Sequence, residues 1–181
     1  TPGALVENKA ESIFSSSVVG GEPTVQDNNA VELGVRFVPN VSGQITGVRF
    51  YKRAADVGTH TGSLWSADGS LLATATFQNE TASGWQQVDF STPVTVAAGT
   101  TYVASYFAPN GNYSFDADVF TAKRITNLTG SLTALSTREG GNGMYLYGGG
   151  FPTNVSNANY FVDVVFNNTA RSAKFLLSAI V

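Results

Sequence analysis

The side chains with the most direct chemical potential are scarce in this sequence. It holds a single histidine, His60, and no cysteine. A serine hydrolase would need that histidine beside a nucleophilic serine, and no Gly-x-Ser-x-Gly turn is present to display one. Without cysteine, disulfides, thiolate nucleophiles and zinc–thiolate sites are excluded. No pair of carboxylates stands out for glycoside hydrolysis. We therefore expect no enzyme, and we expect His60, in the turn 58–62, to bond to its neighbours.

Carboxylates offer a second kind of chemistry, the binding of a structural calcium ion, which prefers several oxygen ligands. Glu32 and Asp163 each interrupt an apolar strand pattern, one early and one late in the chain. First and last strands are often neighbours in jelly-roll sugar-binding modules, so this pair is the favoured site. Asp116 and Asp118 would share one face of an extended segment and form a second candidate. The alternative is that Glu32 and Asp163 face solvent or accept hydrogen bonds from arginine.

Aromatic residues suggest a third chemistry, the binding of sugars. Flat rings stack against the C–H faces of a sugar, and amides read its hydroxyl groups. Tyr145 and Tyr147 are two residues apart in a glycine-rich stretch and would share a face of a strand. The candidate ligand-binding residues are Tyr145, Tyr147, Asn142, Tyr160 and Trp85. Large aromatics also dominate β cores, so a core position is the favoured alternative for the two tryptophans.

These residues must be positioned by strands, because helical periodicity is hard to find anywhere. Short runs alternate apolar and polar residues with the period of two that half-buried strands require. Asp68-Gly69 marks a hairpin turn. The predicted strands lie at 31–37, 48–51, 63–66, 71–77, 86–90, 93–96, 101–107 and 160–166. Strands at this spacing, joined by Gly, Asn and Asp turns, predict a single antiparallel β-sandwich or jelly roll, similar to carbohydrate-binding modules.

Composition narrows the class of partner. Charged residues make up 13% of the 181 residues, about half the usual share, and the net charge of −3 is unclustered. We expect neither nucleic acid nor an anionic membrane as partner. The longest apolar run, 175–181, is too short to span a bilayer. A surface built from Ser, Thr, Asn, Gln and Gly is common in extracellular β proteins, and Thr1-Pro2-Gly3 is typical of a processed end. We expect a secreted or cell-surface protein.

Several ordered motifs resemble the bacterial "domain of unknown function 4082" family. They are Val31-Glu32-Leu33-Gly34-Val35-Arg36-Phe37, Gly47-Val48-Arg49-Phe50-Tyr51-Lys52, Gly58-Thr59-His60-Thr61-Gly62-Ser63-Leu64-Trp65, Ser83-Gly84-Trp85-Gln86-Gln87-Val88, Tyr102-Val103-Ala104-Ser105-Tyr106, Gly141-Asn142-Gly143 and Asn159-Tyr160-Phe161-Val162-Asp163-Val164-Val165-Phe166. The resemblance covers residues 13–166. Phe161 stands where the family is expected to have Trp. The resemblance implies an exported module that occurs beside sugar-processing or adhesive domains, without implying a mechanism.

The predicted domain spans residues 13–168, with apolar segments outside it at 1–12 and 169–181. Each end could form an edge strand of its own sheet or pair with another copy. The sequence therefore predicts a non-catalytic extracellular module that binds a glycan through loop aromatics. The alternative is a structural subunit of an extracellular filament, joined by exchange of its terminal strands.

Overall fold

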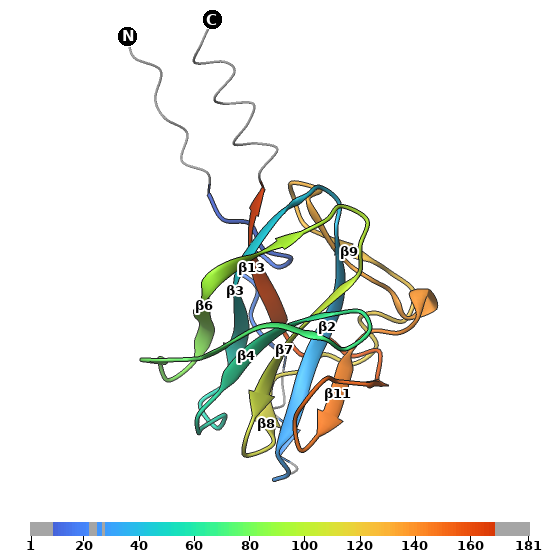
Figure 1. Ribbon diagram of the computed structural model, residues 1–181. Coiled ribbons are helices and arrows are strands. Elements are labelled where there is room, and N and C mark those ends of the chain that lie inside the picture. Colours follow the sequence, from blue (N-terminus) through green and yellow to red (C-terminus); the bar gives the residue numbers. More distant parts are fainter. Residues whose placement is uncertain (1–8, 22–24, 27, 169–181) are drawn as a thin grey trace, which may run out of the picture.

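A computed structural model describes residues 9–21, 25–26 and 28–168 of the chain. Within these ranges almost all regular structure is β-strand, and one short 3-10 helix, η1 (Thr137–Glu139), interrupts it. The strands form two main antiparallel sheets that pack face to face (Figure 1). The prediction of an all-β sandwich is therefore confirmed.

The larger sheet has the strand order β12-β11-β2-β7-β4-β5. A further strand, β10, pairs with the second half of β2 and with β9. The bounds of these strands are β2 (Val31–Pro39), β4 (Thr61–Ser66), β5 (Leu71–Thr76), β7 (Tyr102–Ala108), β9 (Ile125–Thr126), β10 (Leu132–Ala134), β11 (Met144–Tyr147) and β12 (Asn154–Val155). Because β10 and β11 both pair with β2, they meet its edge one after the other.

The smaller sheet has the order β13-β3-β6. Its bounds are β3 (Gly43–Lys52), β6 (Gly84–Val96) and β13 (Val162–Asn168), and a separate two-stranded ribbon joins β1 (Val25–Gln26) to β8 (Asn112–Tyr113). Across the sandwich, β13 faces β2 and β7, β3 faces β4 and β7, and β6 lies beside β5. These strands cover the middle of the larger sheet and leave β11 beyond them.

Alternation along the strands builds the core. Val31, Leu33, Val35 and Phe37 of β2 are buried between the sheets. Between the sheets, the ring of Phe50 on β3 stacks on that of Tyr106 on β7, with their centroids 4.1 Å apart. Burying side chains of this size contributes on the order of 2 kcal/mol each, which is why the alternating pattern fixes the fold.

The outer face of β2 is buried as well, because the segment after β11 folds back over it. A Cβ on Gly34 would lie 3.2 Å from Pro152 and 2.9 Å from the carbonyl oxygen of Ala104. A side chain at this position would therefore crowd both the segment and the backbone of the neighbouring strand. Gly148, Gly149 and Gly150 all have positive φ angles, between 87° and 105°, which form the turn that brings the segment back.

The predicted strand 48–51 is longer in the structure, as β3 (Gly43–Lys52), and other predicted ends shift by one or two residues. Two further differences have a clear physical reason. The last strand begins at Val162 and not at Tyr160, since Phe161 adopts a φ of 55° and its N–H donates to Asn159 Oδ1. The predicted strands 86–90 and 93–96 are one continuous β6. Pro93 is tolerated there because β6 lies at the edge of its sheet and a register irregularity opposite Ile45–Gly47 accommodates the extra residues.

The first described residues pair with the sandwich. The backbone N–H and C=O of Glu11 both bond to Phe166 on β13, each at 2.8 Å. Within the described ranges, no helix is long and apolar enough to cross a membrane. The strand exchange predicted for the two ends falls mainly on residues 1–8 and 169–181, which lie outside the described residues.

Candidate functional site

Four tyrosines meet at one cavity of about 230 Å³, between β8, β11 and the segment that precedes β13. Three of them are the predicted ligand-binding residues Tyr145, Tyr147 and Tyr160. The fourth is Tyr113 on β8. The cavity is completed by Ser156 and by two apolar side chains of β2, Val31 and Leu33.

The four rings form two edge-to-face pairs. Tyr145 and Tyr147 have centroids 6.1 Å apart at an interplanar angle of 80°, and Tyr113 and Tyr160 are 5.5 Å apart at 82°. Tyr113 and Tyr160 are buried, Tyr145 is half-buried and Tyr147 is 53% exposed. The cavity therefore has a buried aromatic wall and an exposed aromatic rim.

The sheet registers explain why a cavity exists here. Tyr145 pairs with Leu33 and Tyr147 with Val31, so both rings lie on the core-facing side of the larger sheet. The smaller sheet does not extend over β11. The two tyrosines consequently face an opening at the margin of the sandwich, where Tyr113 of β8, together with Ser156 and Tyr160, supplies the remaining lining.

The polar end of the cavity is a hydroxyl pair. The hydroxyls of Ser156 and Tyr160 are 2.7 Å apart. Burial raises the pKa of Tyr160, although Ser156 opposes the shift. Its phenol is therefore protonated at neutral pH and can donate a hydrogen bond. The described residues lining the cavity include no Asp, Glu, His, Lys or Arg. Such a lining suits binding through ring faces and hydroxyls better than acid–base chemistry.

Asn142 was predicted as a ligand contact, but it does not belong to this site. It is completely buried. Its Oδ1 accepts from the N–H groups of Arg36 and Gly143 at 2.8 Å, and its Nδ2 donates to the carbonyl oxygens of Arg36 and Leu135. Arg36 lies on β2 between the stretch paired with β11 and the stretch paired with β10. The Asn142 side chain therefore makes the hydrogen bonds to Arg36 that the backbone of a neighbouring strand would otherwise make.

Trp85 also lies apart from the tyrosines, on β6 of the smaller sheet. Its indole N–H donates to the carbonyl oxygen of Val18 at 2.9 Å, its ring stacks on Phe14, and the guanidinium of Arg49 lies 4.3 Å from the ring centroid. It holds the segment 14–18 against the outer face of the smaller sheet. These contacts fit a packing role for Trp85, the alternative favoured from the sequence, better than a role in binding sugar.

The calcium pair Glu32 and Asp163 is not brought together, because β2 and β13 are not neighbours but lie in different sheets. Each carboxylate has its own partners on the outer face of its sheet. Asp163 accepts from Arg49 at 2.8 Å and from the N–H groups of Ile13 and Phe14 at 2.7 and 2.9 Å. The premise that the first and last strands would be neighbours is wrong. The alternative, hydrogen bonding to arginine, is confirmed for Asp163.

The second calcium candidate also differs from its prediction. Asp116 forms an isolated bridge with Asn159, but Asp118 lies in the following turn with a φ of 58°. The segment is not extended, so the two side chains do not alternate as on a strand. Among the residues that the structure describes, no group of three His, Asp or Glu side chains is arranged so that it could hold a metal ion.

Glu32 instead anchors the glycine turn that joins two walls of the tyrosine cavity. Its Oε1 accepts from Ser105 Oγ at 2.6 Å, and Ser105 Oγ accepts from the indole of Trp65 at 2.8 Å. Gly150 donates its N–H to the same carboxyl group. Burial raises the pKa of Glu32 to about 7, although these hydrogen bonds oppose the shift.

This pKa predicts a loss of stability with rising pH. A folded-state pKa near 7, above the ordinary value of 4.5, means that the folded protein holds the proton more tightly than the unfolded chain. The contribution is fully present below the unfolded pKa and is lost as pH rises through the folded pKa. Relative to a Glu32→Gln variant, we expect the free energy of unfolding to fall by about 2–3 kcal/mol between about pH 5 and about pH 8. Urea unfolding at both pH values measures it, and equal pH dependence of the two proteins would contradict it.

His60 lies in a buried ionic cluster. Its Nε2 is 2.8 Å from Asp56 Oδ1 and its Nδ1 is 2.8 Å from Glu80 Oε1. Burial acts to lower the pKa of His60, but Asp56 and Glu80 outweigh it and the pKa is raised. The prediction that His60 bonds to its neighbours is confirmed.

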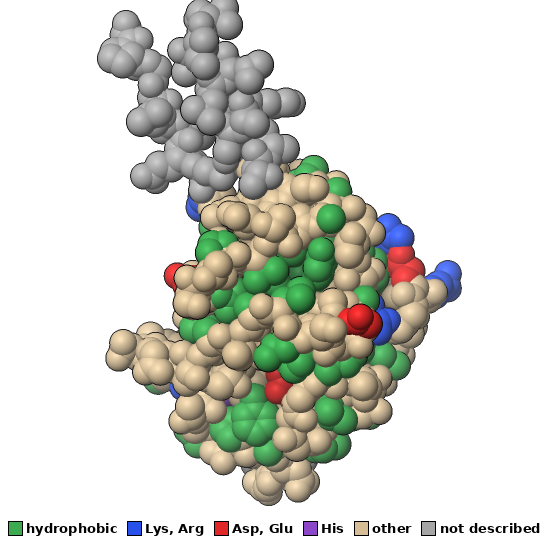
Figure 2. All heavy atoms as spheres, viewed as in Figure 1, with side chains coloured by type: hydrophobic (Ala, Val, Ile, Leu, Met, Phe, Trp, Pro, Cys, Tyr) green, Lys and Arg blue, Asp and Glu red, His purple; other side chains and the backbone are tan. Residues whose placement is uncertain are grey.

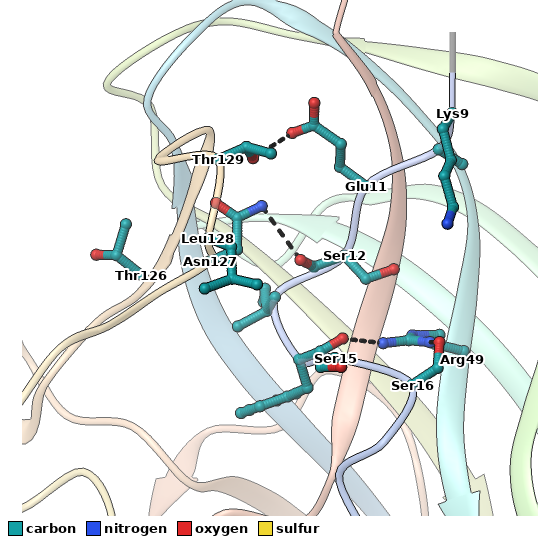
Figure 3. A pocket seen from close by; sticks show the side chains of 13 residues that line it. Lys9, Glu11, Ser12, Ser15, Ser16, Arg49, Thr126, Asn127, Leu128 and Thr129 are labelled. Atoms are coloured by element: carbon teal, nitrogen blue, oxygen red, sulfur yellow. Dashed lines mark hydrogen bonds between the residues drawn. The ribbon is translucent and has the colours of Figure 1, made fainter. Parts of the chain in front are cut away.

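A larger hollow, of about 500 Å³, lies elsewhere, between the segment 9–16 and the turn 126–129 (Figure 3). Its polar groups are largely bonded to each other. Thr129 donates to Glu11 at 2.7 Å, and Asn127 donates to the carbonyl oxygen of Ser12 at 3.2 Å. Among the described residues that line this hollow, Phe14 is the one aromatic residue, and its ring already packs on Trp85. We therefore place the candidate site at the tyrosines.

The tyrosine cavity could be found from the sequence only in part. Tyr145 and Tyr147 signal themselves by their spacing. Tyr113 and Ser156 carry no such signal, because only the β1–β8 ribbon and the turn after β12 bring them to the cavity.

Comparison with known proteins agrees with the motifs noted above. No curated protein matches the chain. A family described as "Domain of unknown function (DUF4082)" matches residues 17–162, a range that includes all four tyrosines of the cavity and every strand except β13, which begins where the match ends. The chain therefore belongs to the DUF4082 family.

Proposed function

We propose that this protein is a non-catalytic binding module that holds a sugar ring of a glycan in the cavity formed by Tyr113, Tyr145, Tyr147 and Tyr160. The observation that carries the proposal is the convergence of four tyrosine rings on one small cavity. Aromatic faces pack against the C–H groups of a sugar, and hydroxyls bond to its hydroxyls.

The size of the cavity sets the size of the ligand. Its volume of about 230 Å³ is below the roughly 300–1,000 Å³ of pockets that enclose drug-sized molecules. A single ring at the end or edge of a longer glycan fits this scale. Val31 and Leu33 supply an apolar floor, and the Ser156–Tyr160 hydroxyl pair fixes orientation.

The surface fits an extracellular role. Figure 2 shows a face on which uncharged side chains predominate and charged ones are scattered. Such a surface gives little electrostatic attraction for nucleic acid or for anionic membranes. An uncharged glycan on a cell surface or in a matrix is a partner whose binding does not require electrostatic attraction.

Tyr147→Ala is expected to weaken glycan binding by about tenfold or more, since the exposed rim ring loses its stacking contact. Because Tyr147 is 53% exposed, the fold should keep its stability. Affinity electrophoresis in gels containing soluble β-glucan, mannan, xylan or chitin oligosaccharides identifies the ligand and measures the loss.

The matched control is Leu71→Ala, which removes a side chain of 51% exposure at the opposite edge of the same sheet. It should leave retention unchanged. Retention of wild type by none of the glycans, or equal retention of wild type and Tyr147→Ala, would overturn the proposal.

A further inference from the structure

A buried network of four ionisable side chains lies away from the tyrosine cavity, at the end of β3. Lys52 Nζ is 2.7 Å from Glu80 Oε2. His60 Nδ1 lies 2.8 Å from Oε1 and 3.0 Å from Oε2 of the same carboxylate, and His60 Nε2 lies 2.8 Å from Asp56 Oδ1. The order Lys52–Glu80–His60–Asp56 is a chain in which each group touches the next.

The network is removed from water. The side chains of Asp56 and His60 are completely buried, and those of Lys52 and Glu80 are each 11% exposed. Aromatic rings shield one side, with the centroid of Phe50 4.9 Å and that of Tyr106 6.1 Å from the imidazole. Two charges held in such surroundings lose several kcal/mol of hydration each.

The charges within the network balance. Burial acts to lower the pKa of His60, but the hydrogen bonds and charges of Asp56 and Glu80 raise it, which favours the charged imidazolium. Two cations, Lys52 and His60, then face two anions, Asp56 and Glu80. Burial is the main reason that the pKa of Asp56 is raised. Among the residues that the structure describes, Asp56 Oδ2 has no hydrogen-bond partner. The hydrogen bond between Asp56 Oδ1 and His60 is therefore the side-chain contact through which Asp56 acts.

We propose that Lys52 and Glu80 condense to an internal isopeptide bond, with His60 as the proton carrier and Asp56 as its positioning residue. Condensation joins an ammonium and a carboxylate into an amide and releases one water, so no oxidant, reductant or cofactor is needed. Groups held in contact by the fold react as if at very high concentration, with effective molarities of about 10⁵–10⁸ M in favourable cases.

The atoms balance as follows. One proton passes from Lys52 Nζ to the carboxylate of Glu80, which leaves a neutral amine and a neutral acid. The lone pair of Nζ attacks Cδ of Glu80 and forms the Nζ–Cδ bond. The bond from Cδ to one oxygen breaks, and His60 Nδ1 gives that oxygen its second proton so that it departs as water. His60 then recovers a proton from the nitrogen of the new amide.

The bond would replace a buried ion pair with a neutral amide and join two parts of the sandwich. Lys52 ends β3 of the smaller sheet, and Glu80 lies on the connection from β5, the edge of the larger sheet, to β6. Because the protein has no cysteine, the isopeptide bond would give it a covalent link between the end of β3 and the β5–β6 connection that a disulfide cannot provide.

The intact mass of the unfolded wild-type chain tests the proposal without any variant. We expect a mass below that of the sequence by one water, and a tryptic digest with a branched peptide that joins Lys52 to Glu80. A full sequence mass would overturn the proposal. So would a missing water that the digest assigns to other residues.

Variants assign the roles. Lys52→Arg keeps the positive charge and should restore the full mass, whereas Lys123→Arg, at an exposed position, should keep the water loss. For Asp56→Asn we expect a smaller linked fraction and a changed pH dependence of the remaining reaction on incubation, which a purely structural role would not produce. An unchanged linked fraction at every pH would remove Asp56 from the mechanism.

Discussion

Replacing Asp163 with alanine should destabilise the protein by about 3–5 kcal/mol, the cost typical of removing one partner from a buried ion pair. Asp163 is completely buried and accepts from Arg49 and from the N–H groups of Ile13, Phe14 and Val164. Its loss leaves a buried guanidinium and these amides without their acceptor. Urea unfolding at neutral pH measures the change.

The same substitution should release the segment around residues 13–14 from the smaller sheet. Amide hydrogen exchange at Ile13 and Phe14 is expected to accelerate more than exchange in β7, since their N–H groups bond to Asp163. A double variant, Arg49→Met with Asp163→Leu, should cost less than Asp163→Ala, because no unpaired charge remains.

Asp89→Ala is the matched control, on an exposed position of β6 in the same sheet, and should change stability by less than about 0.5 kcal/mol. If Asp163→Ala also changed stability by less than about 1 kcal/mol, the buried network would not be a principal source of stability.

Asn142→Ala should cost about 2–4 kcal/mol, the second large effect. The amide accepts from the N–H groups of Arg36 and Gly143 and donates to the carbonyl of Leu135, and each buried polar group left unpaired costs about 1–3 kcal/mol. Because the side chain occupies the point between β10 and β11 on β2, its loss should loosen the start of β11, which carries Tyr145 and Tyr147.

Calorimetry or urea unfolding measures the stability change, and glycan retention measures the effect on the cavity. Asn154→Ala, at an exposed position on β12, removes the same amide and should have little effect on stability. An Asn142→Ala variant as stable as wild type would show that water replaces the amide at no cost.

The sequence by itself determined the class of fold. The alternation at 31–37 and the short, largely apolar runs at 101–107 and 160–166 are typical of strands that bury a face against a partner sheet. The hairpin at Asp68-Gly69 follows from local turn chemistry and is observed between β4 and β5. The spacing of Tyr145 and Tyr147 also predicted correctly that their rings share a face of a strand.

What the sequence left open is which side chains meet. Glu32 and Asp163 carry the same pattern, a carboxylate in an apolar strand, but strand order places them in different sheets with different partners. From the sequence, Asn142 was predicted to bind a sugar through its amide. In the structure its amide bonds to the backbone of β2 instead, in the gap between the stretches paired with β10 and β11.

The tertiary structure also decided where the chemistry lies. Period-two alternation assigns a residue to a face, but it carries no information on the width of the facing sheet. The cavity at the four tyrosines exists because the smaller sheet stops short of β11, and the Lys52–Glu80 contact exists because a connection between sheets passes the end of β3. Both depend on long-range pairing, which local patterns in the chain do not encode.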